Sequence, residues 1–334
     1  MCGIFGMVRS AHDPDPAWAS SVFVALGHLA EERGRDAAGF VLVGDGSGGA
    51  GGGQSDGSDR AALPGRDDDG GPRDLIHRRD VRLGRCRVVK DTRRWGSVWQ
   101  PEFLQALDGA QAALGHTRHA SQGTPGTLAN AAPLAVGEGL IGVHNGDVDA
   151  HALRSGLPIA LPPSHGETDS EVLLLALDRV RGHQRAACHV LETAHGLATL
   201  AWVDRHAPDV VHVARAALCP LAIARDARDN LYWASSPAWF RRLDEQTGGR
   251  LGFEVERVRE GTLLAIAAGA TPSIRARRSF EPVARPGDAW RFPSIWNGLD
   301  PADVAAFQAE ARHRTVRRRT AGARAELAEA APAG

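Results

Sequence analysis

The sequence of 334 residues lacks the features that would assign it to a membrane-bound or nucleic-acid-binding class. No apolar run approaches the length of a membrane span, and the formal net charge of −1 provides no field that would attract nucleic acid or a membrane surface. Lys90 is the only lysine, so almost all of the positive charge comes from arginine. These absences favour a globular protein with neither a nucleic-acid nor a membrane partner.

Cysteine is also scarce, and its spacing forms no metal-binding pattern. Cys2, Cys86, Cys188 and Cys219 include no CxxC pair and no zinc spacing, and nothing marks the chain for secretion. We therefore expect reduced thiols and a cytoplasmic location.

The beginning of the chain, Met1-Cys2-Gly3-Ile4-Phe5-Gly6-Met7, has neither the basic start nor the long apolar core of a signal peptide. Its apolar residues predict a buried strand. If Met1 is removed, which the small Cys2 side chain would permit, one residue carries both a thiol and a free α-amine. It could then be nucleophile and general base together, because an α-amine titrates near ~7.7–8.0 and a thiol near ~8.5. A cysteine at position two is usually incidental, so this hypothesis needs support from later segments.

Hydrophobic periodicity predicts a layered domain of strands and helices that closes near residue 275. Asp15-Pro16 has the cap and first-turn residues of a helix, which Gly34 is expected to stop. Further helices are expected near 101–107, 168–175 and 184–195. Strands are expected at 40–43, 81–90, 197–203, 210–214, 221–225, 231–234 and 258–266.

Two segments stand apart from this domain. Residues 44–74 are mostly Gly, Asp and Ser, so we expect a disordered insertion; no Gly-Lys-Ser/Thr follows that would make it a phosphate loop. Residues 276–334 are expected to form a linker with Trp290 and Trp296, followed by an arginine-rich helix. Those arginines could bind phosphate or an acidic partner, although a solvated helix face is the more usual meaning of such a pattern.

Three stretches concentrate small and polar residues inside an apolar frame. The first is 113–123, the second 130–133 and the third 140–147, in which Asn145-Gly146 predicts a tight turn after a strand. Further along, Thr168-Asp169-Ser170-Glu171 has the pattern of a capping box at the start of a helix.

Together these motifs resemble the glutaminase domain of the class II glutamine amidotransferases, a family with the N-terminal nucleophile hydrolase fold. The resemblance covers about residues 1–270 and rests on six motifs in the correct order: Met1-Cys2-Gly3-Ile4, Arg33-Gly34-x-Asp36-x-Ala38-Gly39, Gly115-His116-Thr117-Arg118, Asn130-x-x-Pro133, His144-Asn145-Gly146 and Thr168-Asp169-x-Glu171. It implies an α+β fold, namely a four-layer αββα sandwich, with no cofactor and no metal.

The resemblance also implies a role for each motif, and the chemistry of amide hydrolysis suits those roles. Cys2 would be the nucleophile, and the Asn145 carboxamide and Gly146 N–H would hold the oxyanion. Arg118 offers a planar fork for the α-carboxylate of glutamine, and Asp169 offers a carboxylate for its α-ammonium. His119, Ser121 and Gln122 are expected to shape the glutamine pocket, and Arg33 and Gly34 to form a loop beside the nucleophile.

Each motif also has a structural alternative. Asn145-Gly146 could be only a turn, Arg118 only a surface ion pair, and Asp169 only a favourable charge at a helix start. His116, His119 and His144 are expected to be structural. At 119–122 and 130–133 the chain departs from the glucosamine-phosphate synthase branch of the family, which leaves the substrate open.

Some 60 residues follow the glutaminase-like domain, too few for a synthase domain. The main hypothesis is therefore a free-standing glutaminase that supplies ammonia to a synthase on another chain. The alternatives are an independent amidase that acts on a γ-glutamyl or other amide, and an inactive scaffold that keeps the fold.

Overall fold

The computed structural model describes residues 1–44, 78–285, 287 and 292–311. The insertion predicted at 44–74 lies outside these residues except for Gly44, and so does most of the arginine-rich tail. No helix within the described ranges is long and apolar enough to cross a membrane.

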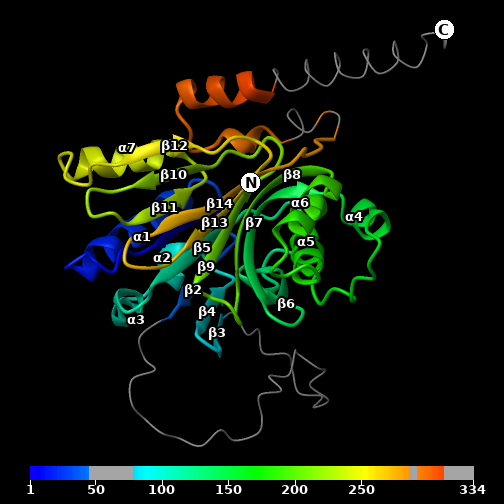
Figure 1. Cartoon of the computed structure of the whole chain (residues 1–334), viewed down its shortest axis with the longest axis horizontal. Helices are drawn as coiled ribbons and strands as arrows, with labels where there is room; N and C mark the ends of the chain where they lie inside the picture. The colour runs from blue at the N-terminus through cyan, green and yellow to red at the C-terminus, as the bar shows by residue number, and fades with distance from the viewer. Residues whose placement is uncertain (45–77, 286, 288–291, 312–334) are drawn as a thin grey trace, which may run out of the picture.

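Two antiparallel sheets face one another, with helices on their outer sides (Figure 1). The strands of the larger sheet are, in spatial order, β12 (Glu254–Arg257), β10 (Ala222–Arg225), β11 (Leu231–Ala234), β1 (Gly3–Val8), β5 (Ala112–Arg118), β2 (Ala37–Val43), β4 (Cys86–Asp91) and β3 (Arg78–Leu83). Those of the smaller sheet are β14 (Ser273–Ser279), β13 (Thr262–Ala267), β9 (Val210–Arg215), β8 (Gly196–Asp204), β7 (Leu140–Val148) and β6 (Leu134–Val136).

The helices form the two outer layers. Those over the larger sheet are α1 (Pro16–Ala30), α2 (Trp95–Val98), α3 (Leu104–Asp108) and α7 (Pro237–Gln246). Those beside the smaller sheet are α4 (Ala150–Gly156), α5 (Asp169–Asp178) and α6 (Gln184–Thr193). Short 3-10 turns lie at η1 (Pro101–Phe103), η2 (Leu128–Asn130) and η3 (Pro293–Trp296). The order of layers is αββα, as expected.

The alternation of side chains along β1 explains why this sheet lies inside the molecule. Ile4 and Val8 belong to the core between the sheets, whereas Phe5 and Met7 belong to the core beneath α1. Successive side chains of a strand point to opposite faces, so a strand that is apolar at almost every position is buried on both. β2 divides its side chains between the same two cores.

Several expected elements differ from the observed ones. The helix begins where Asp15 predicts, and the Asp15 carboxylate accepts from Ala17 N at 3.2 Å, but it ends at Ala30 and not at Gly34. The single strand expected at 81–90 is the hairpin β3–β4, because Gly84 adopts a positive φ of 60° and turns the chain. α7 was not expected from the sequence.

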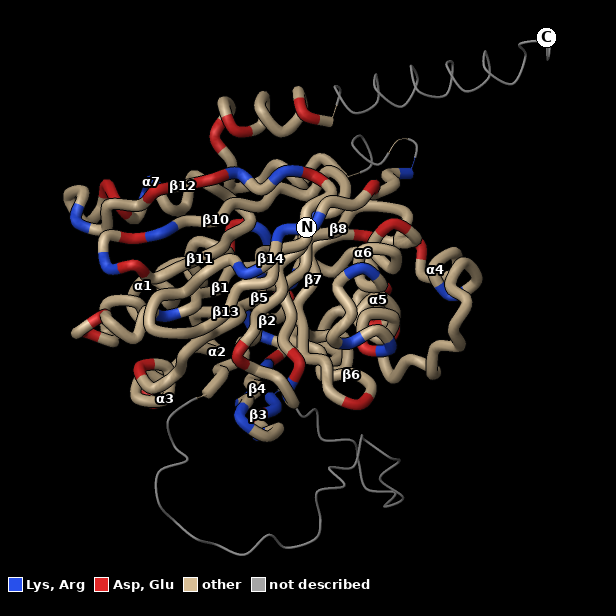
Figure 2. Tube along the Cα trace, in the orientation of Figure 1, with Lys and Arg blue, Asp and Glu red and all other residues tan. Residues whose placement is uncertain are grey.

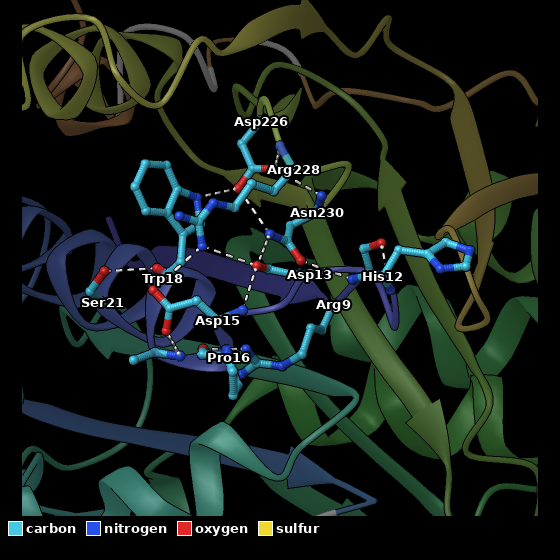
Figure 3. Close-up of polar contacts among 12 residues, drawn as sticks. Arg9, His12, Asp13, Asp15, Pro16, Trp18, Ser21, Asp226, Arg228 and Asn230 are labelled. Atoms are coloured by element: carbon cyan, nitrogen blue, oxygen red, sulfur yellow. Dashed lines mark hydrogen bonds and ion pairs between the residues drawn. The ribbon is translucent and has the colours of Figure 1, made fainter.

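A polar cluster fixes the start of α1 to the turn between β10 and β11 (Figure 3). The Arg228 guanidinium lies 4.0 Å from the centre of the Trp18 ring and forms ion pairs with Asp13 and Asp15. Asp226 accepts from Trp18 Nε1 at 2.9 Å and from Tyr232 Oη at 2.8 Å. These groups satisfy one another, so we assign the cluster a structural role.

The segment 292–311, which includes a helix at 301–311, packs against the domain (Figure 1). Ile295 is fully buried in a small cluster with Met1 and Cys219. Glu310 accepts from Arg215 Nη1 at 2.7 Å, and Phe307 lies beneath the same guanidinium. These residues therefore cover the end of the sandwich where the chain begins.

Candidate functional site

Cys2 lies directly before β1, at the end of the central strand pair of the larger sheet. β1 is antiparallel to β5, and Gly3 is opposite Thr117, so Cys2 lies beside the residues that follow β5. Its Sγ atom is 3.4 Å from His119 N and 3.5 Å from His119 O. Among the four cysteines it alone is not buried.

Arg33 and Gly34, which the resemblance places in a loop beside the nucleophile, lie beside this end of β1. Arg33 Nε donates to the Cys2 carbonyl oxygen at 2.8 Å, and its Nη1 donates to the carbonyl oxygens of Ile295 and Asn297. Burial lowers the pKa of Arg33 to about 10. A Cβ at Gly34 would lie 2.3 Å from the Arg118 carbonyl carbon, so the loop approaches β5 at a distance that requires glycine.

Asn145 and Gly146 are not in a turn. They lie within β7, paired with Thr199 and Ala198 of β8, and this corrects the expectation from the sequence. The Asn-Gly pair has the composition of a turn, but the apolar residues before it continue the strand and β8 pairs along its whole length.

The register of β7 leaves one main-chain N–H at a free edge. The Ala198 N–H donates to the Ala217 carbonyl oxygen, and the Ala198 carbonyl oxygen accepts from Ala216 N, both on the side of β8 that faces β9. Gly146 lies opposite Ala198 on the other side and is therefore not hydrogen-bonded to β8. The Gly146 N–H therefore points to the edge of β7 that pairs with β6, but β6 pairs with β7 only from Leu140 to Gly142.

Side chains occupy the neighbouring positions of that edge. His116 Nε2 contacts the His144 carbonyl oxygen at 3.1 Å, and the Asp169 carboxylate accepts from Val148 N at 2.8 Å. Gly146 lies between these two contacts on the same edge of β7 and is one of the residues that line the cavity beside Cys2.

The Asn145 side chain is fully buried, yet neither its Oδ1 nor its Nδ2 has a hydrogen-bond partner among the described residues. Burying a carboxamide without partners costs about 1–3 kcal/mol. A buried polar side chain without a partner calls for an explanation, and a catalytic role is one that would account for it.

Arg118 and Asp169 both line the same cavity. Arg118, at the end of β5, is buried, and its guanidinium donates to main-chain oxygens of Gln122, Gly123 and Thr124. It forms no ion pair with a carboxylate of the described chain, so the structural alternative, a surface ion pair, does not describe this residue.

Asp169 begins α5, but the capping box is not formed. Thr168 makes no side-chain cap, and Glu171 instead accepts from His165 N and Gly166 N at 2.7 Å each. Burial raises the pKa of Asp169, and His144 opposes that shift.

The cavity has a volume of about 20 Å³, which is enough for one water molecule and far too small for an amino acid. His119, Ser121 and Gln122, which were expected to shape a glutamine pocket, are among its lining residues. A substrate would enter only if this wall moved. Among the other lining residues, Ala132, Thr168 and Ser170 lie within motifs noted in the sequence but were given no role in the pocket, and Leu134 lies in no such motif.

Other contacts that hold the wall were also missed. Glu167 accepts from Thr124 N at 2.7 Å and from Asn130 Nδ2 at 2.9 Å, and Asp36 accepts from Ala120 N at 2.8 Å. Asp36 and Asn130 belong to motifs noted in the sequence, whereas no local pattern marks Glu167.

Two histidines lie against the cavity, and both are buried. His144 Nδ1 is 2.9 Å from Ser170 Oγ, and burial lowers its pKa. Burial lowers the pKa of His116 to about 3. No group of three or more metal-ligating side chains occurs among the described residues.

Desolvation raises the pKa of the Cys2 thiol, with the His119 N–H opposing the shift. Met1 precedes it, with 2% of its surface exposed, and the Met1 α-amine donates to Ser294 Oγ at 3.3 Å. Burial lowers the pKa of this amine.

Solved structures with a similar fold include the following two. Glutamine phosphoribosylpyrophosphate amidotransferase from B. subtilis, solved with ADP and GMP, has a TM-score of 0.54 and 19% identity over 84% of this chain and 49% of that chain. A structure described as the allosteric regulatory enzyme of purine biosynthesis has a TM-score of 0.53 and 20% identity over 82% and 49%. This chain thus spans about half the length of both. No family model and no curated protein matches the sequence.

Proposed function

Because the chain has the N-terminal nucleophile hydrolase fold of glutamine phosphoribosylpyrophosphate amidotransferase, we propose that it is a glutaminase with Cys2 as its nucleophile. The observation that carries the proposal is one cavity that Cys2, Arg118, Gly146 and Asp169 line from four different elements. The likeness of fold alone would not assign an activity.

The reaction begins after removal of Met1, which converts the Cys2 amide nitrogen into a free amine. Because the Cys2 thiol has a raised pKa, a base must take its proton when sulfur attacks the amide carbon. The α-amine is placed on the same residue as the thiol and accepts that proton. It then passes the proton to the leaving nitrogen as the carbon–nitrogen bond breaks, which releases ammonia and leaves a thioester.

Water completes the reaction. It attacks the thioester carbon, its proton returns to sulfur, and glutamate leaves with Cys2 regenerated. In both tetrahedral intermediates the oxyanion accepts from the Gly146 N–H and from Asn145 Nδ2. One such donor typically accounts for about 3–4 kcal/mol of transition-state stabilisation.

Arg118 and Asp169 hold the two charged groups of the amino acid. The Arg118 guanidinium binds the α-carboxylate and the Asp169 carboxylate binds the α-ammonium, and the incoming ammonium favours the ionised form of Asp169. Ser121, Gln122 and His119 move to admit the substrate and then close over it.

The test is the mass of the intact protein before and after treatment with 6-diazo-5-oxo-L-norleucine, a glutamine-like electrophile. We expect a mass that lacks Met1 and one adduct, formed with loss of dinitrogen, on Cys2. Cys2→Ala should abolish both the adduct and the release of glutamate from glutamine. A retained Met1 with an unreactive Cys2 would contradict the proposal.

Residues 119–122 depart from the glucosamine-phosphate synthase branch of the family, which leaves the substrate open. Other amides should therefore be compared with glutamine in the same assay. Faster turnover of a γ-glutamyl amide than of glutamine would identify an independent amidase. We further propose that the ammonia passes to an acceptor bound by a partner protein, which predicts that a cognate synthase raises the rate of glutamine hydrolysis.

A further inference from the structure

A second and larger cavity lies away from Cys2. Its volume is about 430 Å³, within the range of sites that bind small molecules. It lies at one end of the sandwich, where the last strands of the two sheets, β3 and β6, face one another (Figure 1). Leu134 is the one residue that lines both cavities.

The floor of this cavity comes from the alternating side chains of the β3–β4 hairpin and from β6 and β7. On β3, Arg79, Val81 and Leu83 face it, and the residues between them face the opposite side. Val136 and Ile141 continue the apolar surface across the smaller sheet. The body of a ligand at this site would therefore be apolar.

The polar groups of the wall carry an excess of positive charge. Arg79, Lys90 and Arg205 line the cavity, and none of them forms an ion pair with a described carboxylate. Figure 2 shows basic residues gathered on β3 and β4. Glu171 is the one carboxylate among the lining residues, and both of its oxygens already accept main-chain N–H groups.

Lys90 is the deepest of these cations, with 8% of its surface exposed. Its Nζ donates to the Ala131 carbonyl oxygen at 2.8 Å, which leaves two N–H groups for another acceptor. Burial, with a smaller effect of Arg79, lowers the pKa of Lys90 to about 8, and Glu171 opposes that shift. The ammonium therefore still predominates at pH 7.

We propose that this cavity binds a small amphipathic anion, with its carboxylate between Lys90 and Arg79 and its aliphatic or aromatic body on the apolar floor. Neither cation forms an ion pair with a described carboxylate, and a neutral molecule of the same shape would bring them no counter-charge. The site is separate from the Cys2 cavity, so its ligand need not be the amide substrate.

The test uses the full chain with Cys2→Ala, so that its outcome does not depend on glutaminase activity. The probe is 1-anilinonaphthalene-8-sulfonate, whose fluorescence rises in apolar surroundings, and the competitors are octanoate and the neutral 1-octanol. We expect octanoate to displace the probe at a concentration at least tenfold lower than 1-octanol does. Equal displacement by the two would overturn the proposal.

Variants locate the site. Lys90→Met and Arg79→Met should each weaken octanoate binding at least tenfold, and Val81→Trp should block the probe by filling the cavity. Arg82→Met, on the opposite face of β3, is the matched control and should leave octanoate binding unchanged. Unchanged binding in both Lys90→Met and Arg79→Met, with melting temperatures like that of the parent, would contradict the assignment.

A pH titration distinguishes the contribution of Lys90 to anion binding from the contributions of its neighbours. The charged and titratable groups that face it are Arg79 from β3, Glu171 and His165 at α5, and Arg205 after β8. Raising the pH from 7 to 9.5 should weaken octanoate binding as Lys90 loses its proton, and Lys90→Met should remove this dependence. A dependence that persists in Lys90→Met would exclude Lys90 as the anion-binding group.

Discussion

Arg33 Nε donates to the carbonyl oxygen of Cys2 at 2.8 Å, and the same guanidinium also holds residues after β14. The two contacts connect the residue proposed as nucleophile to the segment 292–297, almost three hundred residues later in the chain. The N-terminus is thus fixed from both sides, by β5 through pairing and by Arg33 through hydrogen bonds.

Replacing Arg33 should loosen this end of the molecule. In Arg33→Met the carbonyl oxygens of Cys2, Ile295 and Asn297 lose a charged donor, each such bond being worth about 1.5–3 kcal/mol. We expect the free energy of unfolding to fall by about 3 kcal/mol or more, and labelling of Cys2 by iodoacetamide to change, since the carbonyl beside the thiol is released. Urea denaturation measures the first effect and mass spectrometry the second.

Arg35→Met is the matched control for that variant, because Arg35 is exposed on the same loop. It should change the free energy of unfolding by less than about 0.5 kcal/mol. Similar losses in both variants would show that the Arg33 contacts contribute little.

Asn145→Ala should separate stability from catalysis. The variant removes a buried carboxamide that has no partner among the described residues. The free-energy cost of burying that polar group disappears, and this gain offsets the cost of the cavity that the smaller side chain leaves. We expect the free energy of unfolding to change by no more than about 1 kcal/mol. If Asn145 donates to the oxyanion, kcat for glutamine hydrolysis should fall by about 10²–10³ with little change in KM.

Asn130→Ala provides the contrast. Asn130 Nδ2 donates to Glu167 and its Oδ1 accepts from Glu167 N, so its removal should destabilise the fold by about 1–3 kcal/mol. A kcat that Asn145→Ala leaves intact would exclude the oxyanion role.

Asp169→Asn should remove the preference for a substrate with an α-ammonium group. Asparagine keeps an oxygen that can accept from Val148 N, so the edge of β7 stays capped. We expect KM for glutamine to rise at least about tenfold, equivalent to ~1.4 kcal/mol. Glutaramate, which lacks the α-ammonium, should be hydrolysed with similar kinetic constants by both proteins. If Asp169→Asn impaired both substrates equally, the carboxylate would serve the fold and not the ammonium.

The buried histidines should make the protein sensitive to mild acid. Burial lowers the pKa of His116 to about 3 from an ordinary value of 6.5, so the folded chain keeps it neutral while the unfolded chain takes up a proton. Stability from this group is therefore complete above pH 6.5 and is lost as the pH falls from 6.5 toward 3. The slope is about 1.4 kcal/mol per pH unit for one such group.

His116→Gln tests this assignment, because glutamine can still donate to the His144 carbonyl oxygen but does not titrate. Chemical denaturation at several pH values between 4 and 7 should give a shallower loss of stability in the variant. The same slope in both proteins would assign the acid sensitivity to other groups, such as His212, whose pKa burial lowers to about 4.

The sequence by itself determined the central strands and the start of α1, and the family resemblance implied the αββα order of layers. Runs such as Ile4 to Val8 are apolar at nearly every position, which indicates a strand covered on both faces, and Asp15-Pro16 is a local signal that needs no distant partner. Of the residues that the resemblance indicated, Cys2, Arg118, Gly146 and Asp169 lie around one cavity, whereas Asn145 is not among its lining residues.

Only the tertiary structure decided the rest. Asn145-Gly146 has the local composition of a turn, and pairing with β8 overrides that preference. Glu171 has the spacing of a capping box, but its carboxylate instead accepts hydrogen bonds from the main-chain N–H groups of His165 and Gly166 in the preceding loop. The contact of Arg33 with residues 295–297 and the cavity around Lys90 join segments far apart in the chain. No local pattern encodes such contacts, because they depend on how the two sheets and their loops pack together.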